Sequence, residues 1–381
     1  MHATVAGVFF AFGVGIGLWG GAAGAILARA HIDSAAFGVI LTAYTAAYLV
    51  AMSAGGALAH AFGVRKVLVV GAIAFGAALC ALLNARTAAT VGGILIGSGL
   101  LGGVVDVTMN AEGARIERRL GRPILARLHG AASAGMTIGA ILGSLIVASA
   151  APWAAGLTAA LGLGAAGLAY GRAAMGEAEL AKVALPSAAR GLSFAPALIG
   201  LGIVIGVSIA AETAAALWST ILLRAEAPAL AAIAGLGAAF FSACQATLRF
   251  NADVIRLRFS DRRIIFGSFA VAAAGFAVVA AEGGFAQSVA GFALIGIGTG
   301  AIVPCGFALA ARQTGTQPAI GLSSASLFGA LTRLPAPLAT GAIAQSFSLP
   351  LAFAAFAVAL AAAAAGMAVF ARRNASVTRT V

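Results

Sequence analysis

Residues 99–117 read GLLGGVVDVTMNAEGARIE and form the end of a long apolar run that begins near residue 88, together with the first residues after it. On a helix, the small and polar residues of this stretch fall on a single stripe: Gly99, Gly103, Asp106, Asn110, Gly113 and Glu117. A stripe with a carboxylate and a carboxamide is not expected to face lipid. The stretch therefore predicts a membrane helix packed inside a bundle, with Asp106 and Asn110 directed at something polar.

The next apolar run carries glycines at every fourth position. Gly135, Gly139 and Gly143 fall on one face of a helix. Small residues at this spacing let a second helix backbone approach closely. We therefore expect tight helix packing directly after the polar stripe.

The composition of the chain is that of a membrane protein. Of its 381 residues, 62% are hydrophobic and only 9% are charged. Apolar segments of about 20 residues, the length that crosses a bilayer, follow one another from Ala3 to Ala371. The cysteines lie in such segments, so we interpret them as packed thiols rather than disulfides or metal ligands: Cys80, Cys244 and Cys305. We expect an all-α integral membrane protein without a cofactor or a metal site.

Basic residues give the chain a formal net charge of +12. They are scattered over short loops instead of forming one soluble face, so no nucleic-acid partner is expected. Placing both termini in the cytoplasm puts 19 of the 23 Lys and Arg on the cytoplasmic side. The positive-inside rule therefore predicts this orientation.

Twelve membrane spans are expected along the chain. Their approximate bounds are 3–28, 36–60, 67–84, 88–114, 123–149, 151–171, 195–222, 229–248, 264–281, 286–311, 319–345 and 350–371. The longest polar interval, from Arg172 to Ser193, divides them six and six. We predict an N-terminal six-helix bundle over residues 1–171, a cytoplasmic linker over 172–193, and a C-terminal six-helix bundle with a short cytoplasmic tail over 194–381.

Two arginine-rich turns stand at equivalent places in the halves. Residues 56–66 read GALAHAFGVRK after the second span, and residues 249–263 read RFNADVIRLRFSDRR after the eighth. The pair resembles the signature loops of the major facilitator superfamily, in which a glycine and an aspartate precede a glycine and a basic cluster. The second copy keeps Asp253 and the basic residues, whereas the first has His60 at the aspartate position. This resemblance covers nearly the whole chain.

A second resemblance is confined to about forty residues. The motif begins with Asp106 and Asn110, continues through residues 117–123, and ends with His129, Ser133, Gly135 and Gly139. It resembles a bacterial inner-membrane subgroup related to fucose-type sugar permeases. The resemblances imply two pseudo-symmetric six-helix bundles in the bacterial inner membrane, working by alternating access. They narrow the identity of the solute very little.

Charged and polar residues within the spans are the candidate site residues. For a cavity that binds substrate or coupling ion we select Asp106, Asn110, His129, Glu212, Gln245 and Arg333. Each ionised group costs about 2.5–3.5 kcal/mol at the centre of a membrane helix, so it needs a compensating partner. Arg333 cannot shed its proton, and its partner is either Asp106, Glu212 or an anionic solute. We expect Glu212 and Arg333 to face one aqueous cavity.

Several candidates also have a structural interpretation. Asp106 and His129 are either coupling residues or hydrogen-bonded packing residues, and Trp218 is an anchor at the membrane interface or a stacking platform. Charges at the cytoplasmic span ends are expected to gate conformational exchange: Glu117, Arg118, Arg249, Asp253 and Arg258. Pro304, Pro335 and Pro337 are expected to bend the tenth and eleventh spans.

The sequence favours a secondary active transporter for a small polar solute, a sugar or an organic anion. No ATP-binding motif is present, so we expect coupling to an ion gradient, with proton symport favoured and sodium as the other suitable ion. Met136 follows Gly135 where the drug/proton antiporters of the superfamily have proline, which favours uptake over a proton-coupled efflux antiporter of drugs or metabolites. A non-transporting sensor is another alternative. We expect a monomer in the lipid bilayer and no enzyme activity, since Ile96 replaces the glycine that an intramembrane protease would need near Ser98.

Overall fold

The computed structural model describes residues 2–148, 152–173, 192–315 and 317–377, and these residues form helices and turns with no strand among them. The helices of the first half are α1 His2–Ala30, α2 Ser34–Phe62, α3 Val64–Asn84, α4 Ala88–Leu120, α5 Leu125–Ala148 and α6 Pro152–Ala173. Those of the second half are α7 Pro196–Glu226, the short 3₁₀ helix η2 Pro228–Ile233, α8 Leu236–Arg258, α9 Asp261–Ala280, α10 Phe285–Thr299, α11 Ile302–Gln313, α12 Pro318–Arg333, α13 Ala336–Ser346 and α14 Leu349–Val377. Most of the predicted linker lies outside the described residues.

Helix length and composition agree with a protein that crosses a membrane many times. Within the described residues, ten helical segments are long and apolar enough to span a bilayer, with α10–α11 and α12–α13 each forming one such segment. The helices α6, of 22 residues, and α8, of 23, also have the length of a span. Together these are consistent with twelve spans, six in each half.

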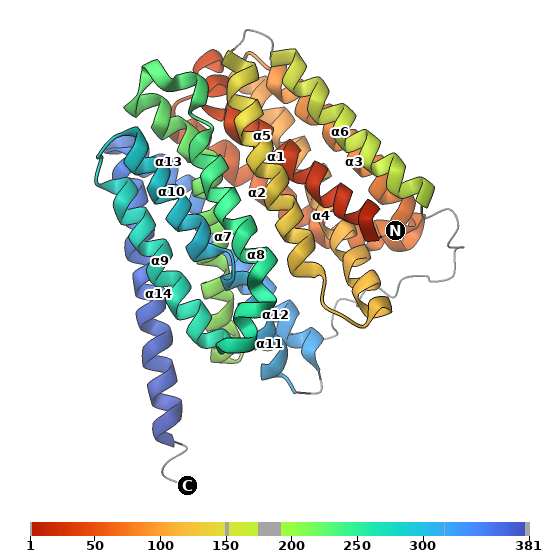
Figure 1. The fold of residues 1–381 in the computed structure, drawn as a ribbon, viewed down its shortest axis with the longest axis vertical. Coiled ribbons are helices and arrows are strands. Elements are labelled where there is room, and N and C mark those ends of the chain that lie inside the picture. Colours follow the sequence, from red (N-terminus) through yellow and green to blue (C-terminus); the bar gives the residue numbers. More distant parts are fainter. Residues whose placement is uncertain (1, 149–151, 174–191, 316, 378–381) are drawn as a thin grey trace.

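The two halves repeat the same helix pairing. In the first half α1 packs along α5, α2 along α4 and α3 along α6, and in the second half α7 packs along α12, α8 along α10 and α9 along α14. Figure 1 shows the first half, red to yellow, beside the second half, green to blue. The repeat of pairings between equivalent spans makes the two bundles pseudo-symmetric.

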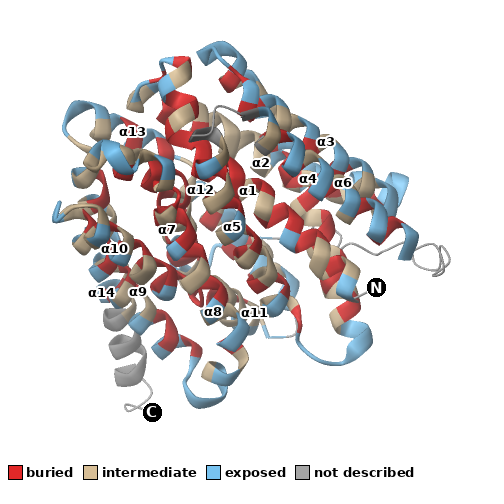
Figure 2. Ribbon diagram, turned by 45° about the horizontal axis from the view of Figure 1, so that its top comes forward, coloured by how far each residue is buried: buried red, intermediate tan, exposed pale blue. Residues whose placement is uncertain are grey.

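Burial differs among the helices, and of the ten apolar segments α1 is the most buried (Figure 2). In α1, 67% of the most apolar window is buried, against 22% in the span of α14. Residues on the outer helices that remain exposed are largely apolar, for example Val70, Leu161 and Val358. An apolar exposed surface is stable only in lipid, which agrees with a bundle embedded in a bilayer.

Glycines of α1 and α5 lock these two helices together. Gly135, Gly139 and Gly143 of α5 lie against the backbone of α1, and Gly17 and Gly21 of α1 lie against the backbone of α5. A Cβ atom at any of these positions would overlap main-chain atoms of the partner helix. The predicted close approach is therefore confirmed, and α1 is the partner.

The polar stripe of α4 also faces protein. Gly99 and Gly103 lie against the backbone of Tyr44 and Tyr48 in α2, and Gly113 lies against Leu128 of α5. The helix is well delimited, since Thr87 forms a capping box with Thr90 at its start and Gly121, with φ 62°, ends it. The prediction that this stripe does not face lipid is confirmed.

Prolines interrupt the tenth and eleventh spans, as predicted. α10 ends at Thr299 and α11 begins at Ile302, so that Pro304, without an N–H group, stands four residues after Gly300 in the break. α12 ends at Arg333, and Pro337 stands four residues after it. The second break therefore lies directly beside a charged residue of the membrane interior.

We call the side of the bundle that carries the α2–α3, α4–α5, α8–α9 and α11–α12 turns the basic end, and the other side the opposite end. Near the opposite end the halves touch backbone to backbone, with Gly38 of α2 on Gly341 of α13. There the Thr220 hydroxyl donates to the Gly20 carbonyl over 2.8 Å. Toward the basic end the halves are joined through α5 and α8, where Gly130 lies against Phe250 and Arg249 donates to Ser133. The halves therefore touch toward both ends, with backbone-to-backbone contact at the opposite end.

Candidate functional site

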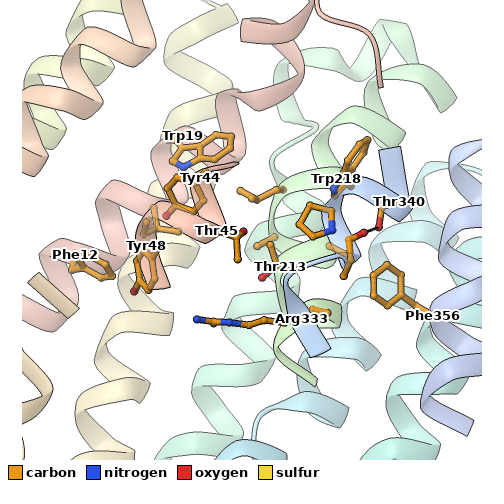
Figure 3. Close-up of a pocket in the computed structure, with 17 residues that line it drawn as sticks. Phe12, Trp19, Tyr44, Thr45, Tyr48, Thr213, Trp218, Arg333, Thr340 and Phe356 are labelled. Atoms are coloured by element: carbon orange, nitrogen blue, oxygen red, sulfur yellow. Dashed lines mark hydrogen bonds between the residues drawn. The ribbon is translucent and has the colours of Figure 1, made fainter. Parts of the chain in front are cut away.

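A central cavity lies between the two halves, with a volume of about 240 Å³. Its walls come from α1, α2, α7, α12, α13 and α14. The polar and aromatic lining residues are Phe12, Trp19, Tyr44, Thr45, Tyr48, Thr213, Trp218, Arg333, Thr340 and Phe356. Figure 3 shows these side chains converging from both halves. We refer to this space as the central cavity.

The threonines of the central cavity face it mainly as hydrogen-bond acceptors. The hydroxyl of Thr45 donates to the Leu41 carbonyl over 2.7 Å. Thr213 and Thr340 likewise donate to carbonyls of their own helices, each over 2.8 Å. Because each hydroxyl proton is engaged, the oxygen lone pairs remain for a ligand.

Arg333 is the only cation that lines the central cavity among the described residues. It is the last residue of α12, and its guanidinium extends toward Tyr48 of α2 (Figure 3). Within the described parts of the chain, no carboxylate lies within the 4.0 Å of an ion pair with it. The cavity thus has a strong donor of fixed positive charge at its surface.

Asp106 lies behind Tyr48, on the α4 side of the central cavity. Its carboxylate accepts a hydrogen bond from the Asn110 side chain over 2.9 Å, and the Tyr48 hydroxyl is close enough to interact with it electrostatically. Arg333 is close enough to interact with Asp106 electrostatically. Asp106, Asn110 and Arg333 therefore lie around Tyr48, a residue that the sequence analysis did not select.

A second group of polar side chains, the polar cluster, consists of Ser133, Glu212, Gln245, Arg249 and Thr299. Glu212 of α7 forms an ion pair with Arg249 of α8 at 3.0 Å. Arg249 also donates to Ser133 of α5 over 2.8 Å, so the cluster bridges the two halves. Ser133 donates to Gln245 over 3.0 Å, and Gln245 lies 3.4 Å from Thr299 of α10.

The polar cluster corrects two expectations. Glu212 does not line the central cavity with Arg333, because it is paired with Arg249 instead. Arg249 is not a loop residue at a span end, because α8 continues for ten residues beyond the predicted boundary at residue 248. The apolar run of the eighth span ends before its helix ends. Hydropathy therefore predicted the end of the helix too early.

His129 lies near the polar cluster rather than in the central cavity. Its ring meets Phe9 of α1 edge to face, with ring centroids 5.4 Å apart. It is also close enough to Arg249 for an electrostatic interaction. Of the six predicted cavity residues, only Arg333 lines the central cavity, and Asp106 and Asn110 adjoin it through Tyr48.

Trp218 was interpreted as either an interface anchor or a stacking platform, and the structure excludes the anchor. The side chain is 1% exposed, and its ring lies 4.9 Å from that of Phe37. Trp19 meets Phe37 edge to face, with ring centroids 6.3 Å apart. These three rings pack between the central cavity and the opposite end, where α1, α2 and α7 meet.

The predicted gating charges have varied surroundings. Glu117 accepts hydrogen bonds from the backbone N–H groups of Ile124 and Leu125, over 2.7 Å and 3.0 Å, and so holds the turn into α5. Arg118 and Arg258 are exposed. Asp253 lies half-buried on α8 and forms none of the ion pairs found among the described residues.

Asp261, which sequence reasoning passed over, is the aspartate that joins helices at the basic end. It begins α9, and its buried carboxylate pairs with Arg256 of α8 at 2.9 Å and with Arg312 of α11. Ser260 before it, in the N-cap position, was the available signal. The spacing of the signature loop favoured Asp253 instead, but Asp253 forms none of the ion pairs found among the described residues.

Known proteins similar to this chain are membrane transporters. No family model matches the sequence. An uncharacterized transporter of Sinorhizobium fredii is 28% identical over 356 residues, covering 92% of each chain. An uncharacterized MFS-type transporter of Yersinia pestis is 26% identical over 377 residues, covering 94% of this chain and 92% of its own.

Solved structures of the same fold cover almost the whole chain. The nucleoside transporter NupG matches with a TM-score of 0.74 at 12% identity, over 97% of this chain and 99% of its own. The human organic anion transporter MFSD10 matches with 0.67 at 17%, over 96% and 98%. The Escherichia coli fucose:proton symporter FucP matches with 0.58 at 15%, over 97% and 98%.

The chain is a multi-pass membrane protein with the major facilitator fold, in which two pseudo-symmetric bundles enclose a central cavity. Its homologues are transporters of the MFS type. The predicted resemblance to the major facilitator superfamily, with a fucose permease among the structural neighbours, is confirmed.

Proposed function

We propose that the chain is a secondary active transporter that moves a small polar solute by alternating access, as a proton-coupled symporter. The observation that carries this proposal is Arg333, a cation with no ion-pair partner among the described residues, at the surface of a cavity between the two halves. A cavity at the interface of two repeated bundles is where a rocking transporter binds its solute.

The side chains of the central cavity suit a solute with a ring and one anionic group, such as a sugar acid or another cyclic organic anion. Arg333 supplies a guanidinium fork that matches a carboxylate. The aromatic rings, among them Trp19, Tyr44 and Phe356, provide flat apolar surfaces for the body of the solute. The threonine oxygens accept hydrogen bonds from solute hydroxyl groups. The structural neighbours are named for a nucleoside, an organic anion and fucose, which agrees with solutes of this size.

Proton coupling is assigned to Asp106. An ionised Asp106 and an anionic solute compete for the positive charge of Arg333, because both carboxylates are attracted to the same guanidinium. Protonation of Asp106 removes this competition and leaves Arg333 to the solute. Proton and solute therefore bind together, which is the condition for symport.

Orientation follows from charge. We assign the basic end to the cytoplasm and the protein to the bacterial inner membrane, with both termini cytoplasmic, because arginine-rich short loops remain on the cytoplasmic side. With that orientation, the close contacts at the opposite end belong to a state that is shut toward the periplasm. The predicted division into bundles over residues 1–171 and 194–381 fits this rocking motion.

The test is uptake into proteoliposomes from a panel of fucose, a nucleoside, a hexuronate and an aromatic carboxylate, driven by an inward proton gradient. We expect uptake of a cyclic carboxylate above that of empty liposomes, unchanged when choline replaces sodium. Asp106→Asn is expected to abolish pH-driven uptake and to preserve solute exchange, since exchange needs no net proton movement. Glu282→Gln, at an exposed turn, is the control. Full pH-driven uptake by Asp106→Asn contradicts the assigned coupling residue, and no uptake of any solute contradicts the transporter.

A further inference from the structure

A second cavity lies on the outside of the second half, and we call it the outer groove. Its volume is about 570 Å³, and it shares no lining residue with the central cavity. Its walls come from the first turns of α7, the start of α9, the end of α11 and the second half of α14. Apolar side chains dominate this lining, for example Leu201, Phe266, Leu309 and Met367.

The depth of the outer groove corresponds to one leaflet of a bilayer. On α7 its lining extends from Pro196 to Val207. Eleven steps of a helix rise about 16 Å, which is about half of the roughly 30 Å hydrocarbon core. The groove therefore reaches from the basic end to the middle of the membrane, where acyl chains are its natural neighbours.

The polar side chains of the outer groove stand at its basic end. Arg262 is exposed there, at the first turn of α9, together with Gln313 at the end of α11. The neighbouring Asp261 is engaged by Arg256 and Arg312. Among the described residues no carboxylate lies within ion-pair distance of Arg262. The mouth of an apolar groove thus has an uncompensated positive charge at the depth of lipid headgroups.

We propose that the outer groove binds one anionic phospholipid from the leaflet at the basic end. An acyl chain lies between α7 and α14, and the phosphate group contacts Arg262. Basic pockets between membrane helices on the cytoplasmic side bind anionic headgroups because charge attraction at the surface adds to burial of the chain. A soluble anion would satisfy Arg262 but leave the apolar walls unfilled, so the occupant needs both a phosphate and a hydrocarbon chain.

The headgroup part of the proposal is tested by native mass spectrometry of the purified full-length protein in detergent, with equal amounts of phosphatidylglycerol and phosphatidylethanolamine. We expect one bound phosphatidylglycerol per protein, preferred about fivefold, as one arginine near the membrane surface provides. Arg262→Gln is expected to remove this preference. Arg263→Gln is the matched control, because Arg263 is also exposed in the same turn but does not line the groove.

The position of the acyl chain is tested by filling the groove. Gly200 lines it, and a Cβ atom there meets no atom within 4 Å, so Gly200→Phe places a ring in the groove without disturbing packing. Gly162 of α6 is equally open and lies in the other half, which makes Gly162→Phe the control. We expect Gly200→Phe, and not Gly162→Phe, to lose the bound lipid of either headgroup, with both variants keeping the thermal midpoint of the parent.

Three results would overturn the proposal. The first is the absence of a bound lipid in the parent protein, which would leave the groove to a segment of the chain or to detergent. The second is that the parent and Arg262→Gln each retain the two phospholipids equally, which would mean that the site recognises the hydrocarbon chain alone. The third is undiminished lipid binding by Gly200→Phe, which would place the lipid elsewhere.

Discussion

At the scale of single residues, Arg333 shows how position converts a costly side chain into a binding group. An arginine at the centre of a membrane helix costs about 2.5–3.5 kcal/mol on insertion scales. Here the charge lies beside the α12–α13 break, faces a cavity, and interacts with Asp106 at longer range than an ion pair. The positive charge of Arg333 is therefore only partly compensated by Asp106 and can still attract an anionic solute.

Removal of this charge is expected to affect binding before it affects folding. Arg333→Gln should raise the dissociation constant of the best solute of the panel roughly 30-fold or more, the effect of deleting one partner of a desolvated charge pair. Arg333→Lys should be intermediate, because an ammonium lacks the planar fork. Isothermal titration calorimetry on the purified protein measures this, and unchanged affinity in both variants would remove Arg333 from the solute site.

The sequence identified the charged members of the site but not their aromatic neighbours. Asp106 and Arg333 are conspicuous because ionised groups are rare in apolar runs. Tyr44, Tyr48 and Trp19 are not, because aromatic residues occur throughout membrane helices without a pattern that separates cavity walls from packing. Which acid meets which base was also beyond the sequence, since Glu212 and Arg249 come together only through the packing of α7 on α8.

At the scale of helices, the polar cluster ties α7, α8 and α5 together. The Glu212 and Arg249 side chains are only 17% and 15% exposed, so neither charge is well solvated alone. Glu212→Gln leaves Arg249 without its ion-pair partner. The expected loss of stability is at the lower end of the roughly 3–5 kcal/mol seen when a buried ion pair is broken.

The double variant Glu212→Gln, Arg249→Gln provides the comparison for this prediction. It should recover most of the thermal midpoint that Glu212→Gln loses, because no charge is left unpaired. Thermal unfolding in detergent measures both variants, with Glu282→Gln as an exposed control. If the double variant loses as much thermal midpoint as the two single variants lose together, the ion pair is not the source of the stability.

The basic end offers a second prediction at this scale. Asp261 pairs with arginines of α8 and α11 at the start of α9. Asp253 takes part in none of the ion pairs found in the described part of the chain. Asp261→Asn should therefore slow transport and leave solute affinity nearly unchanged, because it changes a contact at helix ends and not the cavity. Asp253→Asn, first expected to have this effect, becomes the matched control. Turnover and affinity in proteoliposomes separate them, and a slower Asp253→Asn with a normal Asp261→Asn would reverse the assignment.

Helix bounds were predictable where apolar runs and helices coincide, and they failed where the two differ. The breaks near Pro304 and Pro335 followed from the missing N–H group of proline. The length of α8 did not, because its last ten residues are too polar to be taken for a membrane helix. Charged residues predict membrane topology well. They also make a helix that continues beyond the hydrocarbon core look like a loop in the sequence.

At the scale of the whole molecule, the contact between α2 and α13 holds the two halves together at the opposite end. A Cβ atom at Gly341 would come within 2.8 Å of the Gly38 Cα atom. Gly341→Leu should therefore push the halves apart at the opposite end and favour the alternate state. Gly93→Leu is the control, since a Cβ atom at Gly93 meets no atom within 4 Å.

The measurement uses a cysteine introduced at Thr45, in the central cavity, with Cys80, Cys244 and Cys305 replaced by serine. A membrane-impermeant thiol reagent applied at the opposite end should label this cysteine faster in Gly341→Leu than in the parent. Equal rates in both, with intact labelling in detergent, would mean that this contact does not control access.

Arg333 has no ion-pair partner in the described part of the chain, and this has an electrical consequence for the proposed symport. A solute that brings one negative charge, together with one proton for Asp106, crosses as a neutral set, and the charge of Arg333 stays with the protein. Each net charge that crosses gains or loses about 2.3 kcal/mol per 100 mV of membrane potential, so a neutral set is indifferent to that potential. Uptake of the carboxylate solute should then respond to a pH gradient but not to a valinomycin-imposed voltage, and the transporter would accumulate its solute even in a depolarised cell.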